Sequence, residues 1–313
     1  MAYNSPAHSS APIRVAVVGD VHDAWDSDDA FALKQLGIDL VLLVGDFGNE
    51  SIEVVRSIAS LDLPKAVIFG NHDAWYTATD WGRKLRSVVS AEDGVQKQLD
   101  LVGDAHVGYS KLDFPALGLS VVGARPFSWG GSAWKHEQFY QSRFGVNSFA
   151  ESTAKIMQAV QQTTYDTVIF IGHCGPTGLG EEPEAPCGKD WKPIGGDHGD
   201  PDFAEAIAQT RTLGKSIPLV AFGHMHHSLR HTKEQLRKMV EAQDGTVYLN
   251  AASVPRIIDT RIGKIRNFSL VTLQDGAVTK ASLAWVNPNF EIEAETLLYE
   301  QPASRVEINN SRV

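Results

Sequence analysis

The chain has 313 residues, 43% of them hydrophobic and 21% charged, which is an ordinary globular composition long enough for one large α/β domain or two average ones. Its 28 basic and 38 acidic residues give a net charge of −10, which argues against nucleic acid or an anionic membrane as a partner because both need concentrated positive charge. No apolar run approaches the ~20 residues that span a bilayer. These features predict a cytoplasmic protein of one domain, with residues 1–12 as a flexible leader.

Five short apolar runs each end at a glycine that is followed at once by a polar residue able to bind a metal. The runs cover residues 15–20, 40–46, 66–71, 168–173 and 219–224. Continuous aliphatic and β-branched runs of this length predict strands that are buried on both faces. The glycines let the backbone turn sharply and approach a bound ion closely.

Helical patterns lie between these runs. Their expected N-terminal caps are Asn49 or Ser51 before residue 52, Ser148 with Glu151, and Asp202 with Glu205. Alternating strands and helices predict right-handed βαβ units with mainly parallel pairing. Ligands bind beyond the carboxyl ends of such strands, where the five glycines stand.

The pattern changes after residue 228. Residues 246–249, 268–272 and 281–285 read as short strands, with a hairpin turn at Asp275-Gly276. They predict a second, more antiparallel sheet. We expect a single domain over residues 13–287, followed by a peripheral or partly disordered tail over residues 288–313.

The polar residues at the five predicted strand ends form a candidate metal site. They are Asp20, His22, Asp46, Asn71, His72, Asp73, His173, His224 and His226. Carboxylate, amide and imidazole donors without a thiolate suit two divalent transition-metal ions, Mn²⁺ or Fe, with Zn²⁺ as the alternative. Even seven ligands from this set exceed what one tetrahedral ion needs, and a carboxylate shared between two ions accounts for that number.

The motifs Asp20-Val21-His22, Gly45-Asp46, Gly70-Asn71-His72-Asp73, Gly172-His173 and Gly223-His224-Met225-His226 resemble the five blocks of the calcineurin-like metallophosphoesterase superfamily, in the family order. The resemblance covers roughly residues 13 to 250. It implies an α/β fold, a four-layer αββα sandwich with two mixed sheets. It also implies hydrolysis of phosphate esters by in-line attack of a hydroxide that bridges two metals.

The resemblance also implies a role for each residue. Asp20, His22 and His226 would hold the first ion, Asn71, His173 and His224 the second, and Asp46 would bridge the two. His72 would act as general acid or contact the phosphate, with Asp73 orienting it.

Two departures from the motifs of the superfamily's protein Ser/Thr phosphatases restrict the class of substrate that we expect. Asp46 is followed by Phe47-Gly48-Asn49 and not by an arginine, and the third block ends in Asp73. Both disfavour a protein phosphatase and leave a small phosphorylated metabolite or nucleotide as the expected substrate. The ligands do not separate monoester from diester cleavage. A non-catalytic metal-binding scaffold of the same fold is the rival reading, which the complete ligand set disfavours.

Two segments are candidates for substrate selection. Arg125 follows an apolar strand in the aromatic, turn-rich loop 123–131, and arginine binds phosphate oxygens bidentately. Residues 174–201 form a long Gly/Pro-rich loop that leaves directly from His173, and we expect a lid there. These segments also resemble a little-characterised subgroup of the superfamily associated with cyanobacteria and plant plastids. Cys174 and Cys187 are too few for a disulfide scaffold, and a redox link between them stays open.

Overall fold

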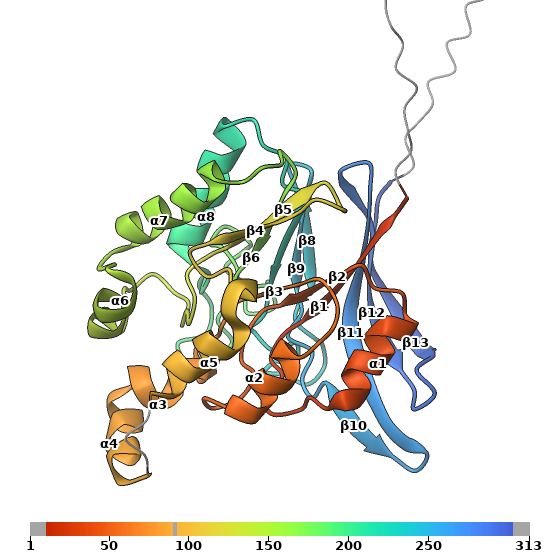
Figure 1. The fold of residues 1–313 in the computed structure, drawn as a ribbon, viewed down its shortest axis with the longest axis horizontal. Coiled ribbons are helices and arrows are strands. Elements are labelled where there is room, and N and C mark those ends of the chain that lie inside the picture. Colours follow the sequence, from red (N-terminus) through yellow and green to blue (C-terminus); the bar gives the residue numbers. More distant parts are fainter. Residues whose placement is uncertain (1–10, 90–92, 303–313) are drawn as a thin grey trace, which may run out of the picture.

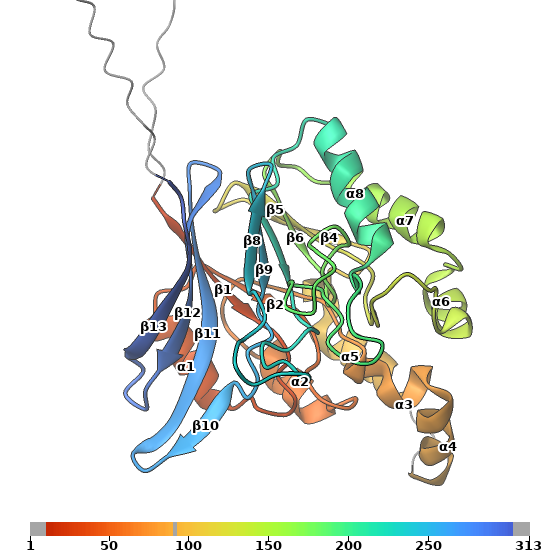
Figure 2. The ribbon, with the colours of Figure 1, turned by 180° about the vertical axis from the view of Figure 1, so that it is seen from behind.

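A computed structural model describes residues 11–89 and 93–302 of the chain. Two sheets pack face to face in the middle of the molecule, and helices cover the outer face of each (Figures 1 and 2). The expected α/β fold with two mixed sheets is confirmed. The expected leader, except for its last two residues, lies outside the described ranges.

The first sheet has strands from both ends of the described chain. In order across the sheet they are β13 (Ile292–Glu300), β12 (Ala277–Val286), β11 (Gly263–Gln274), β1 (Ile13–Val18), β2 (Leu40–Leu43) and β3 (Lys65–Val67), with β10 (Ile257–Thr260) paired to β11. The strands β1, β2 and β3 are parallel, and β11 joins β1 in the antiparallel direction. The carboxyl ends of β1, β2 and β3 therefore meet at one edge of the sheet.

The second sheet is formed by the middle of the chain. Its order is β4 (Lys111–Phe114), β5 (Leu119–Gly123), β6 (Val168–Ile171), β7 (Leu219–Phe222), β9 (Thr246–Asn250) and β8 (Val240–Gln243). The four inner strands β5, β6, β7 and β9 are parallel. The edge strands β4 and β8 pair with their neighbours in the antiparallel direction.

The helices connect these strands and lie on the outside. They are α1 (Ser27–Gln35), α2 (Ile52–Ala59), α3 (Trp75–Ala78), α4 (Asp80–Val89), α5 (Gly94–Val102), α6 (Glu137–Phe144), α7 (Phe149–Gln161) and α8 (Pro201–Thr212), with the 3₁₀ turns η1 (His72–Ala74) and η2 (Gly103–Ala105). Figure 1 shows α1, α2 and α5 beside the first sheet and α7 with α8 beside the second. No helix in the described ranges is long and apolar enough to cross a membrane.

Three apolar clusters hold the four layers together. In β1, Val15 and Val17 point into the cluster between the sheets, whereas Ala16 and Val18 point into the cluster beneath α1, α2 and α5. The strands of the second sheet alternate in the same way between the central cluster and the one beneath α7 and α8. Because both faces of each inner strand are buried, the strands appear in the sequence as unbroken apolar runs.

The C-terminal strands differ from the expectation of a separate antiparallel sheet. Strand β9 completes the second sheet parallel to β7, while β11, β12 and β13 extend the first sheet beyond β1. The hairpin turn at Asp275-Gly276 is confirmed, since it joins β11 to β12 with both residues at positive φ. Residues 292–300, within the expected tail, form the edge strand β13.

The helix starts were predicted with mixed success. Ser148 caps α7 through its hydroxyl, which accepts from the backbone N–H of Glu151. The predicted cap at Asp202 is wrong, because α8 already begins at Pro201 and its N-cap is Asp200. Proline fits the first helical position, where its missing N–H is not needed.

Candidate metal centre

The residues predicted as ligands lie together where the carboxyl ends of β1, β2 and β3 face those of β6 and β7. They form groups whose donor atoms all lie within 4.8 Å of one another. Each sheet contributes donors to the site. The strands position these donors rigidly because both faces of every strand involved are buried.

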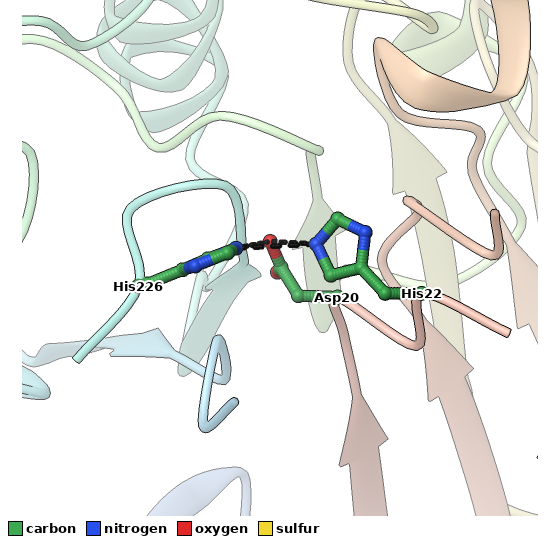
Figure 3. A group of neighbouring side chains, drawn as sticks. All are labelled: Asp20, His22 and His226. Carbon is green, nitrogen blue, oxygen red and sulfur yellow. Dashed lines mark hydrogen bonds and ion pairs between the residues drawn. The ribbon is translucent and has the colours of Figure 1, made fainter. Parts of the chain in front are cut away.

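The first group consists of Asp20, His22 and His226. Asp20 and His22 follow β1, and His226 comes from the loop after β7. In Figure 3 the two imidazoles direct their Nε2 atoms toward the carboxylate from opposite sides. His226 Nε2 lies 3.3 Å and His22 Nε2 3.9 Å from Asp20 Oδ1, and the two Nε2 atoms are 3.2 Å apart.

The second group consists of Asp46, His173 and His224, with Asn71 beside them. His173 Nε2 lies 3.3 Å from Asp46 Oδ1, 2.9 Å from Asn71 Oδ1 and 3.2 Å from His224 Nδ1. Four donor atoms from the ends of β2, β3, β6 and β7 thus converge on one point.

Asp46 lies between the two groups. Its Oδ1 faces His173, whereas its Oδ2 lies 4.0 Å from His22 Nε2 and also 4.0 Å from His72 Nε2. A carboxylate that turns one oxygen to each group has the geometry that a bridging ligand requires.

The backbone is strained at this site. Asp20, His22, Asp46 and His224 all have positive φ, a conformation that non-glycine residues rarely adopt and that clusters at functional sites. The neighbouring glycines make room for these ligands. A Cβ at Gly223 would lie 2.2 Å from Asp20 Oδ2, and one at Gly70 would lie 2.3 Å from Asp46 Oδ1.

The residues present fit metal ions. Asp20 Oδ1 is buried and accepts no hydrogen bond from the described residues, with the His226 ring nitrogen near it at 3.3 Å, an arrangement that a bound cation would complete. His173 donates from Nδ1 to the carbonyl of Val44, so Nε2 is the nitrogen that faces the other donor atoms and would coordinate an ion once its proton is lost. A backbone acceptor that fixes the tautomer in this way is typical of metal-binding histidine.

The charges of the site support one another. Burial works against the ionisation of Asp46, but the adjacent histidines, His173 first, hold the pKa of its carboxyl well below its usual range. Burial alone would lower the pKa of His173, whereas Asp46 raises that pKa to about 9. Asp46 is therefore an anion available to cations at neutral pH.

The comparison with protein families agrees with this geometry. A family model described as calcineurin-like phosphoesterase matches residues 13–228. The chain belongs to the calcineurin-like phosphoesterase family. The expected superfamily is confirmed. No curated protein matches the sequence.

Solved structures resemble this calcineurin-like phosphoesterase at low sequence identity. One crystal structure has a TM-score of 0.50 at 10% identity, covering 84% of this chain and 95% of its own. TT1561 of Thermus thermophilus has a TM-score of 0.47 at 12% identity, covering 92% and 100%. A dimetal phosphatase from Danio rerio has 0.43 at 13%, covering 92% and 99%. At these identities the likeness concerns the fold alone.

His72 of this calcineurin-like phosphoesterase lies at the edge of the metal donors. Its Nδ1 is 2.7 Å from Asn49 Oδ1, which leaves Nε2 facing Asp46, and its ring stacks on Trp75 at 5.1 Å. Asp73, expected to orient His72, does not do so. Its carboxylate is buried and accepts from the backbone N–H groups of Asp46, Phe47 and Gly70.

Asp73 thus connects the loops after β2 and β3 through these backbone hydrogen bonds. The residue that orients the His72 ring is Asn49. The sequence offered Asn49 only as a helix cap. Its position three residues after Asp46 was the available signal, because a residue on the same loop as a ligand can reach the site.

The expectation that Arg125 binds substrate is corrected by the structure. Arg125 is 2% exposed and does not line the pocket beside the metal donors. Its guanidinium forms ion pairs with Asp200, through Nη2, and with Asp202, where Nε lies 3.0 Å from Oδ2. Its Nε and Nη2 donors are already engaged by two buried carboxylates.

The loop over residues 174–201 covers one side of the site and is fixed to the protein by Arg237, which is 2% exposed. Nη1 of Arg237 donates to the carbonyls of Pro183 and Ala185, each at 2.8 Å, and Gly188 at 2.6 Å, while Nε donates to the carbonyl of His226 at 3.0 Å. Arg237 therefore connects the loop to a candidate ligand. No motif or spacing in the sequence indicated this role. Cys174 and Cys187, both in this loop, are buried free thiols.

Proposed function

We propose that the chain is a dinuclear metal-dependent phosphoesterase that hydrolyses a phosphate ester of a small metabolite or nucleotide. The observation that carries the proposal is the pair of donor groups with Asp46 turned toward both. The pocket beside them, about 490 Å³ in volume, is of the size that binds small molecules. The narrower resemblance to cyanobacterial and plastid members is part of the proposal, and it brings no substrate with it.

The residues would divide the work as follows. Asp20, His22 and His226 would hold one ion, Asn71, His173 and His224 the other, and Asp46 would hold both. Two ions of Mn or Fe, or else Zn, would supply Lewis acidity toward the phosphoryl oxygens and an activated water.

His72, as the imidazolium with a proton on both ring nitrogens, would give the Nε2 proton to the departing ester oxygen and be left neutral. Asn49 accepts from Nδ1 and so turns Nε2 toward the site, where a proton donor must point. Stacking on Trp75 fixes the plane of the ring. Asp73 would act only indirectly, by holding the backbone of Asp46 and Gly70 in place.

The rival is a metal-binding scaffold without activity. The test is the release of phosphate from an aryl phosphate by the purified protein, with and without added Mn²⁺. We expect turnover that depends on the metal and is lost on chelation. Stoichiometric metal without any turnover, on mono- and diesters alike, would favour the scaffold.

Asp46→Asn tests the bridge. The wild-type protein should contain close to two metal ions per chain. Because Asp46→Asn removes the charge common to both donor groups, we expect the metal content to fall at both positions. Elemental analysis measures it, and Asp62→Asn is a matched control because the Asp62 side chain is 95% exposed and its ion pair with Lys34 lies at the surface. Full metal content in Asp46→Asn would exclude Asp46 as the bridge.

A further inference from the structure

The pocket beside the metal donors has an unusual wall. Three tryptophans, Trp75, Trp129 and Trp191, line it together with the candidate metal ligands. Hydrolysis of a phosphate ester requires metals and a proton donor but no aromatic surface. Trp75 fixes the ring of His72, so Trp129 and Trp191 are the tryptophans available to the part of the substrate beyond the scissile phosphate.

The rings form two series that lead away from the metal donors. In the first, His72 stacks on Trp75 with ring centroids 5.1 Å apart and planes at 16°, and Trp75 stacks on Trp129 at 5.4 Å and 27°. This series begins at the proposed proton donor.

The second series begins at a candidate metal ligand. His198 stacks on His224 at 6.1 Å and 15°, and Trp191 meets His198 edge-on at 4.7 Å. The guanidinium of Arg230 lies 5.4 Å from the centre of the Trp191 ring. Trp191 is thus two ring contacts away from the metal donors and lines the same pocket, so a substrate has to extend beyond its phosphate to reach this ring.

Two cations on the pocket wall are available for a further negative charge. Within residues 11–89 and 93–302, Lys135 donates only to the carbonyl of Gly130, at 3.2 Å, and Arg230 is exposed over Trp191. Neither side chain forms an ion pair within the part of the chain that the structure describes. Arg237, also in the wall, is by contrast fully engaged with backbone carbonyls and Asp190.

We propose that the pocket selects a nucleotide that carries a second phosphate besides the one that is cleaved. The base would stack on the Trp191 side of the pocket, and Lys135 and Arg230 would bind the second phosphate. Base–aromatic stacking tolerates any base, because every base has a π face. This inference rests on the proposed function.

The stacking arm compares three monoesters on the Mn²⁺-loaded protein: AMP, ribose 5-phosphate, which lacks the base, and phenyl phosphate, whose ring is joined directly to the ester oxygen. We expect kcat/KM for AMP to exceed that for ribose 5-phosphate by about tenfold, with Trp191→Leu lowering this ratio about tenfold and Trp191→Phe lowering it less than about threefold. Leucine retains apolar bulk without a ring, so this pair of variants isolates stacking. Phenol is a better leaving group than a sugar hydroxyl, so phenyl phosphate serves only as a gauge of the chemical step. Equal kcat/KM values for AMP and ribose 5-phosphate would overturn the nucleotide assignment.

The charge arm compares adenosine 3′,5′-bisphosphate with AMP. We expect the bisphosphate to be preferred about tenfold in kcat/KM, and Arg230→Ala to remove most of that preference while Arg230→Lys keeps part of it. Arg56→Ala is the matched control, because Arg56 is an exposed arginine on α2. An unchanged preference in Arg230→Ala would overturn the role given to Arg230.

Calorimetry on the metal-stripped protein gives a reading without turnover, in which we expect AMP to bind more tightly than ribose 5-phosphate. The two levels of inference fail differently. If no ester is hydrolysed under any metal condition, the proposed function fails. If esters are hydrolysed but the base and the second phosphate change nothing, the function stands and the selectivity inference fails.

Discussion

His72 illustrates how a neighbour distant in sequence from the motif can decide what a motif residue does. The two adjacent polar residues of its block are committed elsewhere, Asn71 to His173 and Asp73 to three backbone amides. The residue that controls the ring is Asn49, on the preceding loop. The role of His72 should therefore depend on Asn49 more than on its sequence neighbours.

We expect His72→Ala to leave metal content nearly unchanged and to depress kcat, most strongly for esters with poor leaving groups, which need protonation most. Steady-state kinetics on an alkyl and an activated aryl phosphate measure this. Equal losses on the two esters would point instead to phosphate binding by His72, and loss of metal would make His72 a ligand.

Asn49→Ala should reproduce part of the His72→Ala loss, because the ring would keep its nitrogens but lose its fixed orientation. If Asn49 acts through His72, the double variant should be no slower than His72→Ala alone. Additive losses in that cycle would give Asn49 a separate role.

At the scale of elements, the buried pairs of Arg125 join the exit of β5 to the start of α8. Its guanidinium also lies 5.1 Å from the ring centre of Trp134 and 5.5 Å from that of Tyr140. The residue therefore holds the second sheet to its covering helix. Breaking a buried ion pair by removing one partner leaves an uncompensated charge in the interior.

Arg125→Ala should accordingly destabilise the fold by about 3–5 kcal/mol, while kcat/KM of the protein that remains folded stays close to normal. Urea denaturation measures the free energy of unfolding, and Arg56→Ala should change it by less than about 0.5 kcal/mol. A large rise in KM with unchanged stability would restore Arg125 as a substrate residue.

The same element shows why local signals misplace boundaries. Asp202 and Glu205 have the spacing of a capping box, but the Asp202 carboxylate is held by Arg125 and by the hydroxyl of Ser152. These partners come from distant parts of the chain. A local pattern cannot reveal that competition.

At the scale of the whole molecule, the features that could be predicted from the sequence are those that residues close together in the chain determine. Each strand-end motif fixes its own turn, so the ligands and their convergence could be derived from five short segments. Sheet membership could not, since β11 pairs with β1 across most of the chain and β9 pairs with β7. The arginines show the same limit, because the carboxylates and carbonyls around Arg125 and Arg237 approach only in the folded state.

His106 gives the whole fold a sensitivity to acid. It is partly buried with its ring 5.3 Å from that of Phe69, its Nε2 has no hydrogen-bond partner, and burial lowers its pKa to about 4. The unfolded chain, with the ordinary pKa near 6.5, therefore binds this proton more readily than the folded one. Stability from this group is complete above pH 6.5, falls as the pH drops toward 4, and levels off below that.

His106→Phe keeps the ring contact and removes the titration. The difference in unfolding free energy between variant and wild type, measured in chelator from pH 7 to 4, should shift in favour of the variant by up to about 3 kcal/mol as the pH falls. A difference that does not vary with pH would show that His106 is not protonated on unfolding.

Both donor groups draw on both sheets, with Asp20 and His22 from the first facing His226 from the second, and Asp46 from the first facing His173 from the second. An ion in either group would therefore cross-link the two halves of the sandwich. Only the folded chain assembles these donors, so metal in excess stabilises it by mass action, by about 2.7 kcal/mol at 100 times its dissociation constant. Metal supply would thus set the fraction of the chain that is folded as well as its catalytic activity, and a substitution that removes one donor would lower both.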